Sequence, residues 1–284
     1  MDPTPKLHSQ PDVAAPVDLE AYGKRIGWTG GWQPSLETFR GIHLAHAQTI
    51  PYENLDILLG KRISLQPDQI EKKLVQQRRG GYCFEQNGLL ARVLEQIGFT
   101  VTRLAARVRL QASQLTPRTH QILLIRVDDE EWLADVGFGS WGLVEPIPLR
   151  ADEHFHQGPW EIWLEREGNQ WVLKSAQSPI GLDQYSFLLE PQQPIDYEPA
   201  NHYCSTHPDS KFVKTLTAQK AGLKRRYLLR NLELFVSDAE GTVSRQIPPQ
   251  ELLKVLQEFF GLEFPEGTVF RTSSGPLNEP GILS

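Results

Sequence analysis

The sequence predicts an α+β protein of three successive parts: an N-terminal helical bundle over residues 1–98, an antiparallel β-barrel over residues 99–190 and a mixed α/β segment over residues 191–284. Two observations predict this order. Apolar residues recur at helical spacing up to about residue 98, and they then partly alternate with polar residues, which is typical of half-buried strands. Glycine and proline interrupt the alternating segments often, as they do in small antiparallel barrels and sandwiches.

Capping residues mark the helix starts in the first part. Asp18 and Ser35 can accept hydrogen bonds from backbone N–H groups, and Pro67 suits the first turn of a helix. The third helix is predicted to stop at Gly80, because glycine readily adopts the left-handed conformation that ends a helix. The four predicted helices begin near Asp18, Ser35, Pro67 and Cys83.

Two β-hairpins are predicted in the middle part. Each joins two apolar segments through a short turn that is rich in acidic residues, asparagine or glycine. The first pairs residues 121–127 with 132–136, and the second pairs residues 161–165 with 171–174.

The last part mixes both kinds of structure. A helical or irregular stretch over residues 194–204 is followed by strands predicted at 212–218 and 226–236. A hairpin turn at 239–241 and a helix over 249–261 complete the chain.

Composition excludes several classes of function. A net charge of -6 gives no basic surface for nucleic acid, and no apolar run approaches the roughly 18 residues of a membrane helix. Residues 1–16 lack the apolar core of a signal peptide and are expected to form a flexible tail. Cys83 and Cys204 could form one disulfide, but without export signals we expect a reduced, cytoplasmic chain.

Cys83 is the strongest candidate for a reactive group. It follows Gly80 and Gly81, which form a sharp turn, and it opens a helix. Backbone N–H groups and the positive end of the helix dipole are expected to lower the pKa of a thiol placed there. A free cysteine is more often a small buried apolar residue, so this position alone does not establish reactivity.

A base and an orienting carboxylate are available in the first hairpin. His120 precedes one strand and Asp135 lies in the other, so the hairpin places them within a residue or two of the same level. An aspartate inside an apolar strand is costly without a partner, and an imidazole N–H can provide one. Each residue alone has an ordinary structural explanation, but together with Cys83 they predict a Cys-His-Asp site like that of papain-like and transglutaminase-like enzymes.

Longer motifs lie at residues 50–56, 79–87, 117–120, 135–139 and 201–210. On these motifs the chain resembles the arylamine N-acetyltransferases over roughly residues 18–265. The resemblance implies a helical bundle, a β-barrel and an α/β lid. It also implies acetyl-CoA as co-substrate, no metal, and a triad of Cys83, His120 and Asp135.

The resemblance also implies a reaction: Cys83 takes the acetyl group from acetyl-CoA and passes it to the nitrogen of an arylamine, hydrazine or arylhydroxylamine. Tyr52 and His202 depart from the family's usual Phe and aromatic residue, and the second puts acceptor preference in doubt. A homo-oligomer is left open.

Weaker assignments concern the coenzyme and the support of the turn. Phe138 and Gly139 are predicted to line the cleft, although the surrounding G-x-G-x-x-G pattern also fits a plain turn and precedes no helix. Thr206 and His207 are predicted to approach the coenzyme from the lid. A buried ion pair between Glu53 and Arg79 is predicted to brace the Cys83 turn.

Three alternatives remain at this point. A cysteine amidase or hydrolase would use the same triad with water as acceptor, and a macrolactam-forming amide synthase would use it without acetyl-CoA. A binding module without catalysis would leave Cys83 inert. His154 and His156 lack a third ligand, so a metal site is not expected.

Overall fold

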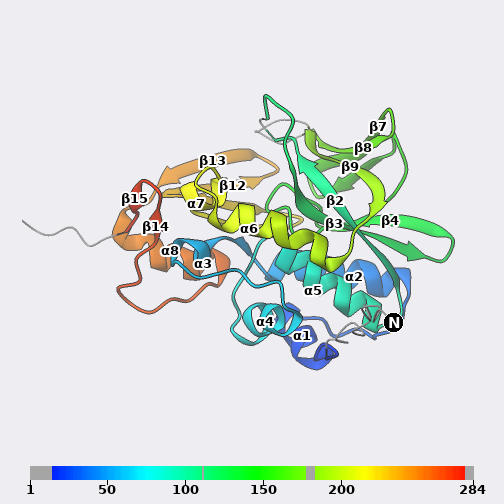
Figure 1. Cartoon of the computed structure of the whole chain (residues 1–284), viewed down its shortest axis with the longest axis horizontal. Helices are drawn as coiled ribbons and strands as arrows, with labels where there is room; N and C mark the ends of the chain where they lie inside the picture. Colours follow the sequence, from blue (N-terminus) through cyan, green and yellow to red (C-terminus); the bar gives the residue numbers. More distant parts are fainter. Residues whose placement is uncertain (1–14, 111, 177–182, 279–284) are drawn as a thin grey trace, which may run out of the picture.

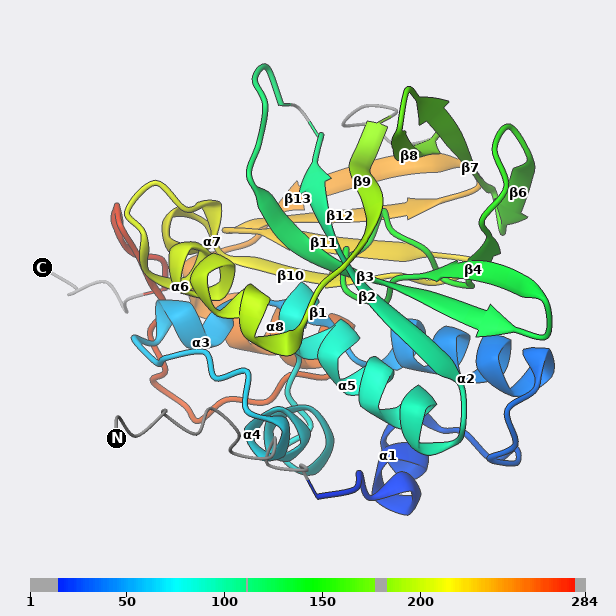
Figure 2. The ribbon, with the colours of Figure 1, turned by 45° about the vertical axis from the view of Figure 1, so that its right-hand side comes forward.

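The structure is a computed structural model that describes residues 15–110, 112–176 and 183–278. Most of the predicted N-terminal tail, residues 1–14, lies outside these ranges. Helices of the N-terminal part pack below a large antiparallel sheet, and a second sheet with its own helix lies beside it (Figures 1 and 2). The predicted α+β class is therefore confirmed, whereas the part boundaries after residues 98 and 190 stay a prediction.

The predicted caps form as expected in the N-terminal part. Asp18 Oδ1 accepts a hydrogen bond of 2.9 Å from the Ala21 N–H, and Ser35 Oγ accepts one of 3.2 Å from the Thr38 N–H. The helices are α1 (Leu19–Ile26), α2 (Leu36–Thr49), α3 (Leu55–Leu58), α4 (Pro67–Glu71) with the π-helical turn η1 (Lys72–Gln76), and α5 (Cys83–Gln96).

The predicted end of the third helix is wrong. The helix widens into η1 and ends at Gln76, and Arg78 then takes the left-handed conformation with φ 54°. Gly80 instead allows a close approach between chain segments, because a Cβ there would lie 2.1 Å from the Pro51 carbonyl oxygen. Any side chain at residue 80 would push the Cys83 turn away from this segment.

The central sheet has eight strands in the order β5-β4-β3-β2-β9-β8-β7-β6 and forms a near-barrel. Both predicted hairpins are confirmed: Val127 pairs with Glu130, and Glu167 pairs with Gln170. The strands are β2 (Thr100–Val108), β3 (Arg118–Val127), β4 (Glu130–Ala134), β5 (Ile147–Pro148), β6 (His154–Gln157), β7 (Trp160–Glu167), β8 (Gln170–Ser175) and β9 (Asp183–Pro191).

Strand β3 is buried on both faces, which explains its continuous apolar sequence. Leu123 and Ile125 pack with α1, α2 and α5, while Ile122 and Leu124 pack into the core between the strands. Alternate residues of one strand thus serve two cores, and this fixes its register against the helix that carries Cys83.

The C-terminal part holds a five-stranded sheet in the order β1-β10-β11-β12-β13, with α8 packed against one face. Gly261 ends α8 in the left-handed conformation at φ 67°, as predicted for this helix end. The elements are β1 (Tyr52–Glu53), η2 (Pro194–Tyr197), α6 (Glu198–Thr206), α7 (Lys211–Lys214), β10 (Thr217–Lys220), β11 (Arg226–Arg230), β12 (Glu233–Asp238), β13 (Gly241–Gln246), η3 (Pro249–Glu251), α8 (Leu252–Phe260), β14 (Arg271–Thr272) and β15 (Gly275–Pro276).

Two strand predictions in this part are wrong in detail. Residues 212–218 begin as the helix α7, because Ser210 caps it by accepting a hydrogen bond of 3.2 Å from the Phe212 N–H. Residues 226–236 form two strands rather than one, because Asn231 turns the chain in the left-handed conformation at φ 52°.

The first strand of the C-terminal sheet comes from far away in the sequence. In β1, Tyr52 pairs with Gln219 and Glu53 pairs with Ala218 of β10. The Asn54 side chain secures this joint by donating hydrogen bonds to the Phe212 and Thr215 carbonyl groups at 2.7 and 2.8 Å. Across the described ranges, no helix combines the length and the apolar character needed to cross a membrane.

Candidate active site

Cys83 is the first residue of α5, and its side chain is only 3% exposed. The Glu85 carboxylate folds back over the helix start and accepts a hydrogen bond of 3.1 Å from the Tyr82 N–H. A Cβ on Gly81 would lie 2.6 Å from that carboxylate, so only glycine fits in the turn. The sequence around Cys83 therefore builds a tight start for α5 with the thiol at its first turn.

A network of five charged side chains braces this turn. The predicted contact between Arg79 Nη2 and Glu53 Oε1 is present at 2.9 Å, and Arg79 Nη1 also binds Asp56 Oδ1 at 3.1 Å. Lys73 Nζ binds Asp56 Oδ2 at 3.2 Å and Glu85 Oε1 at 2.7 Å. Because the side chains are largely buried, each charge depends on its neighbours for compensation.

The two hairpin strands bring His120 to Asp135. The pairing of Leu123 with Ala134 sets residue 135 two positions from the level of residue 120. His120 Nε2 lies 2.7 Å from Asp135 Oδ2, and both side chains are buried. The Cys83 thiol donates a hydrogen bond of 3.6 Å to the Thr119 carbonyl oxygen, and His120 lies near enough to act on the pKa of the thiol.

The pKa values in this cluster are set by burial and by the three partners together. Burial alone would lower the pKa of His120, but the charge of Asp135 and the hydrogen bonds to Asp135 and Cys83 raise it to about 10. Burial raises the pKa of the Cys83 thiol, against which the hydrogen bond and charge of His120 act. The helix start was expected to lower the pKa of this thiol, but burial has the larger effect.

Asp135 is held by residues that the sequence analysis did not single out. Asn87 donates a hydrogen bond of 2.8 Å to Asp135 Oδ1, and its carbonyl oxygen accepts one of 3.0 Å from the Val136 N–H. His43 Nε2 accepts a hydrogen bond of 3.1 Å from the Asp135 N–H. Asn87 could have been found from the sequence, because it lies four residues after Cys83 on the same face of α5.

A buried polar chain supports the Gly80–Gly81 turn from the helical side. Gln86 Nε2 donates a hydrogen bond of 2.9 Å to the Pro51 carbonyl oxygen, so Gln86 Oε1 is the acceptor for His46 Nε2 at 2.7 Å. His46 Nδ1 must then accept the hydrogen bond of 2.8 Å from the Tyr22 hydroxyl. Burial lowers the pKa of His46 to about 3, which keeps the ring neutral.

The loop over residues 137–142 packs against the triad and against the C-terminal sheet. The Phe138 ring lies 5.1 Å from the His120 ring and 5.0 Å from the Tyr185 ring. On the other side, Gln219 Oε1 accepts hydrogen bonds of 2.9 and 3.0 Å from the Ser140 N–H and hydroxyl. Gly139 has φ 93°, and a Cβ there would lie 2.4 Å from Gln219 Oε1.

Comparisons with known proteins address the whole of this arrangement. A family model described as N-acetyltransferase matches residues 35–269. The arylamine N-acetyltransferase of Escherichia coli (strain K12) is 44% identical over 248 residues, which cover 86% of this chain and 88% of that protein. The chain belongs to the arylamine N-acetyltransferase family. The resemblance seen in the sequence motifs is confirmed.

Solved structures of the family share the fold described above. The Nocardia farcinica arylamine N-acetyltransferase superposes with a TM-score of 0.83 at 39% identity, over 88% of this chain and 90% of that one. The Mycobacterium marinum arylamine N-acetyltransferase, solved in complex with CoA, superposes with a TM-score of 0.81 at 31% identity, over 86% and 92% of the two chains. The helical part, the near-barrel and the C-terminal sheet thus form the arylamine N-acetyltransferase fold.

Two residues predicted to approach the coenzyme lie at the exposed end of α6. Thr206 donates a hydrogen bond of 2.6 Å to the His202 carbonyl oxygen, and the His207 ring stacks on the Tyr203 ring at 4.7 Å. Within the described part of the chain, neither residue has a direct contact with Cys83 or His120. Their place in coenzyme binding by this arylamine N-acetyltransferase family member therefore stays a prediction.

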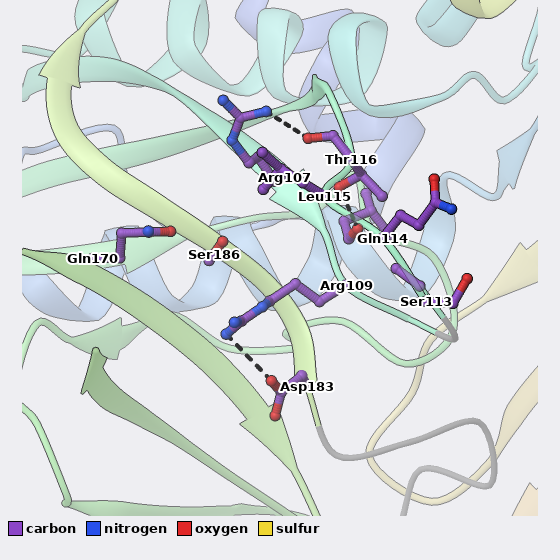
Figure 3. Close-up of a pocket in the computed structure, with 11 residues that line it drawn as sticks. Arg107, Arg109, Ser113, Gln114, Leu115, Thr116, Gln170, Asp183 and Ser186 are labelled. Carbon is purple, nitrogen blue, oxygen red and sulfur yellow. Dashed lines mark hydrogen bonds and ion pairs between the residues drawn. The ribbon is translucent and has the colours of Figure 1, made fainter. Parts of the chain in front are cut away.

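An open pocket of about 410 Å³ lies beside the last residues of β2 and the first residues of β9 (Figure 3). Arg107 donates a hydrogen bond to the Thr116 carbonyl oxygen, and Arg109 Nη1 pairs with Asp183 Oδ2 at 3.2 Å. Both guanidinium groups are thus engaged by the protein itself. The described residues that line the pocket do not include the triad.

Proposed function

We propose that this chain transfers an acetyl group from acetyl-CoA to the nitrogen of an arylamine, hydrazine or arylhydroxylamine through an acetyl-Cys83 intermediate. Membership of the arylamine N-acetyltransferase family supports the reaction. The observation that supports the assignment of residues is the buried contact series from Cys83 through His120 to Asp135. Such a series activates a thiol, orients the base and stabilises its charged form.

In the first half-reaction, the Cys83 thiol gives its proton to His120, and the resulting thiolate attacks the carbonyl carbon of acetyl-CoA. A new C–S bond forms, and the tetrahedral intermediate then breaks its bond to the sulfur of CoA. The leaving CoA thiolate takes a proton from His120 and departs as the free thiol. Since one thioester replaces another, the step is nearly isoenergetic and needs no ATP.

In the second half-reaction, the acceptor nitrogen attacks the acetyl carbon on Cys83. His120, now neutral, takes a proton from that nitrogen, and the C–S bond breaks to release the amide and return the Cys83 thiolate. Asp135 holds Nε2 of the ring throughout, which leaves Nδ1 facing the sulfur. Backbone N–H groups near Cys83, that of Gln121 among them, can stabilise negative charge at the reacting centre.

Acetyl-CoA is the donor that the family comparison supports. The Mycobacterium marinum relative was solved in complex with CoA, which makes the same coenzyme the expected donor here. We assign Phe138 and Gly139 to the cleft wall because their loop adjoins His120, and Thr206 and His207 to the outer coenzyme contacts. Both cysteines are free thiols, which agrees with a reducing cytoplasmic compartment as the place of action.

Intact-mass measurement tests the proposal directly. Wild-type protein mixed with acetyl-CoA alone should gain one acetyl group and lose it when an aromatic amine or hydrazine is added. Cys83→Ser should gain none. Cys204→Ser is the matched control, because Cys204 is equally buried but does not contact His120, and it should still be acetylated.

Other outcomes would overturn the proposal. Acetylation of Cys83→Ser at the wild-type rate would exclude Cys83 as nucleophile. Rapid loss of the acetyl group to water, with no increase on adding amine, would indicate a hydrolase. A wild-type Cys83 that reacts with neither acetyl-CoA nor iodoacetamide would indicate a protein that binds ligands without catalysis.

A further inference from the structure

Arg226 is a buried charge with no acidic partner in the described part of the chain. It is the first residue of β11, and its side chain is 1% exposed. Leu229 of the same strand packs with α8, so Arg226 faces the opposite side, toward the central sheet. Its Nε, Nη1 and Nη2 atoms all lack a hydrogen-bond acceptor among the residues that the structure describes.

Two tryptophans from the central part surround this guanidinium group. Its central carbon lies 4.0 Å from the Trp160 ring centre and 5.8 Å from the Trp141 ring centre. Stacking on an aromatic face is favourable for the cation, but it covers the flat face of the group. The N–H bonds lie in the guanidinium plane and point elsewhere, so the rings do not satisfy them.

Trp141 adds a further donor to the same cluster. Its indole Nε1 is also buried and has no acceptor within the described ranges. Four nitrogen atoms that can only donate are therefore gathered around one positive charge. Burying such groups without a partner is costly, and a protein normally provides an acceptor for each.

The charge of Arg226 persists in this setting. Burial lowers its pKa to about 9, and no carboxylate acts against this effect. The group thus stays positive at neutral pH. What it lacks is an acceptor that carries one negative charge.

We propose that Arg226 and Trp141 form a binding site for a small monovalent anion, a halide or a short carboxylate, between the central near-barrel and the C-terminal sheet. One negative charge balances one guanidinium, and a single compact acceptor can serve several donors. Gly158 of the β6–β7 turn packs closely on the segment before β11, because a Cβ there would lie 1.8 Å from the Leu223 carbonyl oxygen. Close packing of these two segments, which flank Trp160 and Arg226 in the chain, favours a small anion over a phosphate ester.

The location gives the site a structural role. Trp141 belongs to the 137–142 loop, whose Phe138 contacts the His120 ring. Arg226 belongs to the C-terminal sheet, which also holds that loop through Gln219 and Ser140. A bound anion would therefore fasten the loop beside the triad to the C-terminal sheet at a second point.

Thermal unfolding tests the site without any measurement of acetyl transfer. Chloride should raise the unfolding midpoint of the wild-type protein above that in gluconate at the same ionic strength, by about 2 °C at chloride concentrations near ten times Kd. Arg226→Met should lose this difference. Arg225→Met, the exposed neighbour paired with Asp238, is the matched control and should keep it.

Two further measurements apply even if Arg226→Met fails to fold. Crystals of the wild-type protein grown with bromide should show an anomalous peak beside Arg226. Trp141→Phe, which keeps an aromatic ring but removes the indole N–H, should weaken the effect of chloride on the unfolding midpoint. Chloride and gluconate giving the same midpoint in the wild type, or density at Arg226 that holds water but no bromide, would overturn the proposal. An equal chloride effect in Arg226→Met would do the same.

Discussion

Two arginines with little exposed side chain have very different surroundings. Arg79 beside the Cys83 turn and Arg226 in β11 each place a guanidinium over an aromatic ring, at 4.5 Å from the Phe264 centre and 4.0 Å from the Trp160 centre. Arg79 also binds two carboxylates in the plane of its guanidinium, and only its Nε lacks an acceptor within the described chain. Among the residues that the structure describes, no carboxylate pairs with Arg226.

The difference shows what each group does. The carboxylates of Glu53 and Asp56 raise the pKa of Arg79 despite its burial, whereas burial lowers that of Arg226. Arg79 is thus one member of a charge-balanced scaffold that the chain completes by itself. The N–H groups of Arg226 need an acceptor such as the proposed anion, and stacking on an aromatic ring cannot replace that acceptor.

The largest expected effect comes from removing the balanced cation. Arg79→Met should lower the free energy of unfolding by about 3–5 kcal/mol, because it leaves the buried Glu53 carboxylate without its ion-pair partner, while Asp56 keeps Lys73. Arg226→Met, measured in gluconate, should change it by less than about 1 kcal/mol, because no opposite charge is left behind. Urea unfolding measures both, with the exposed Arg78→Met as control for Arg79. Equal losses for Arg79→Met and Arg226→Met would break the comparison.

A smaller effect is expected for His46, a buried side chain that is neutral whereas both arginines are charged. The pKa of His46 is lowered in the folded state, so its contribution to stability is full above the ordinary value of 6.5 and is lost as pH falls toward 3. His46→Gln can keep both hydrogen bonds without this titration. Between pH 7 and pH 5 its free energy of unfolding should fall by roughly 2 kcal/mol less than that of the wild type.

Urea unfolding at several pH values checks this slope, and His156→Gln is the control because His156 is exposed. If the two variants show the same pH dependence as the wild type, then His46 is not held neutral by the fold.

The smallest effect concerns the loop that links the two regions. Gln219→Ala removes the acceptor for both Ser140 donors, which should cost about 1 kcal/mol in loop placement. We expect kcat/KM for acetyl transfer to fall about 5- to 10-fold. Gln219→Glu keeps an acceptor and should restore most of the activity, and steady-state kinetics with separate kcat and KM values measure this. An undiminished kcat/KM in Gln219→Ala would show that the loop is held without it.

Local patterns predicted the elements that local chemistry determines. Asp18 and Ser35 cap their helices within a few residues, and the short hairpin turn after Val127 sets where His120 and Asp135 meet. The end of the third helix was missed because the π-helical turn depends on packing rather than on a local stop signal. The helix α7 was missed because Ser210 caps a segment whose residues favour strands.

The sequence motifs predicted the triad and the Glu53–Arg79 pair, but not the other residues that hold the site together. Lys73 and Asp56 join the network around the Cys83 turn from positions with no local signal, and Gln219 reaches Ser140 across 79 residues. In the sequence, Arg226 is an ordinary residue of a predicted strand. Its guanidinium group becomes buried beside Trp141 and Trp160 only when the C-terminal sheet packs against the central part.

The placement of β1 in the C-terminal sheet also sets an order of assembly. Tyr52 and Glu53 are synthesised long before Gln219 and Ala218, the residues they pair with. The β1–β10 edge of the sheet therefore forms only after more than half of the chain has been synthesised. The same short segment pairs through Tyr52 with Gly81 of the Cys83 turn. The turn that presents the thiol thus shares β1 with an edge of the C-terminal sheet that can pair only after residue 219 has been synthesised.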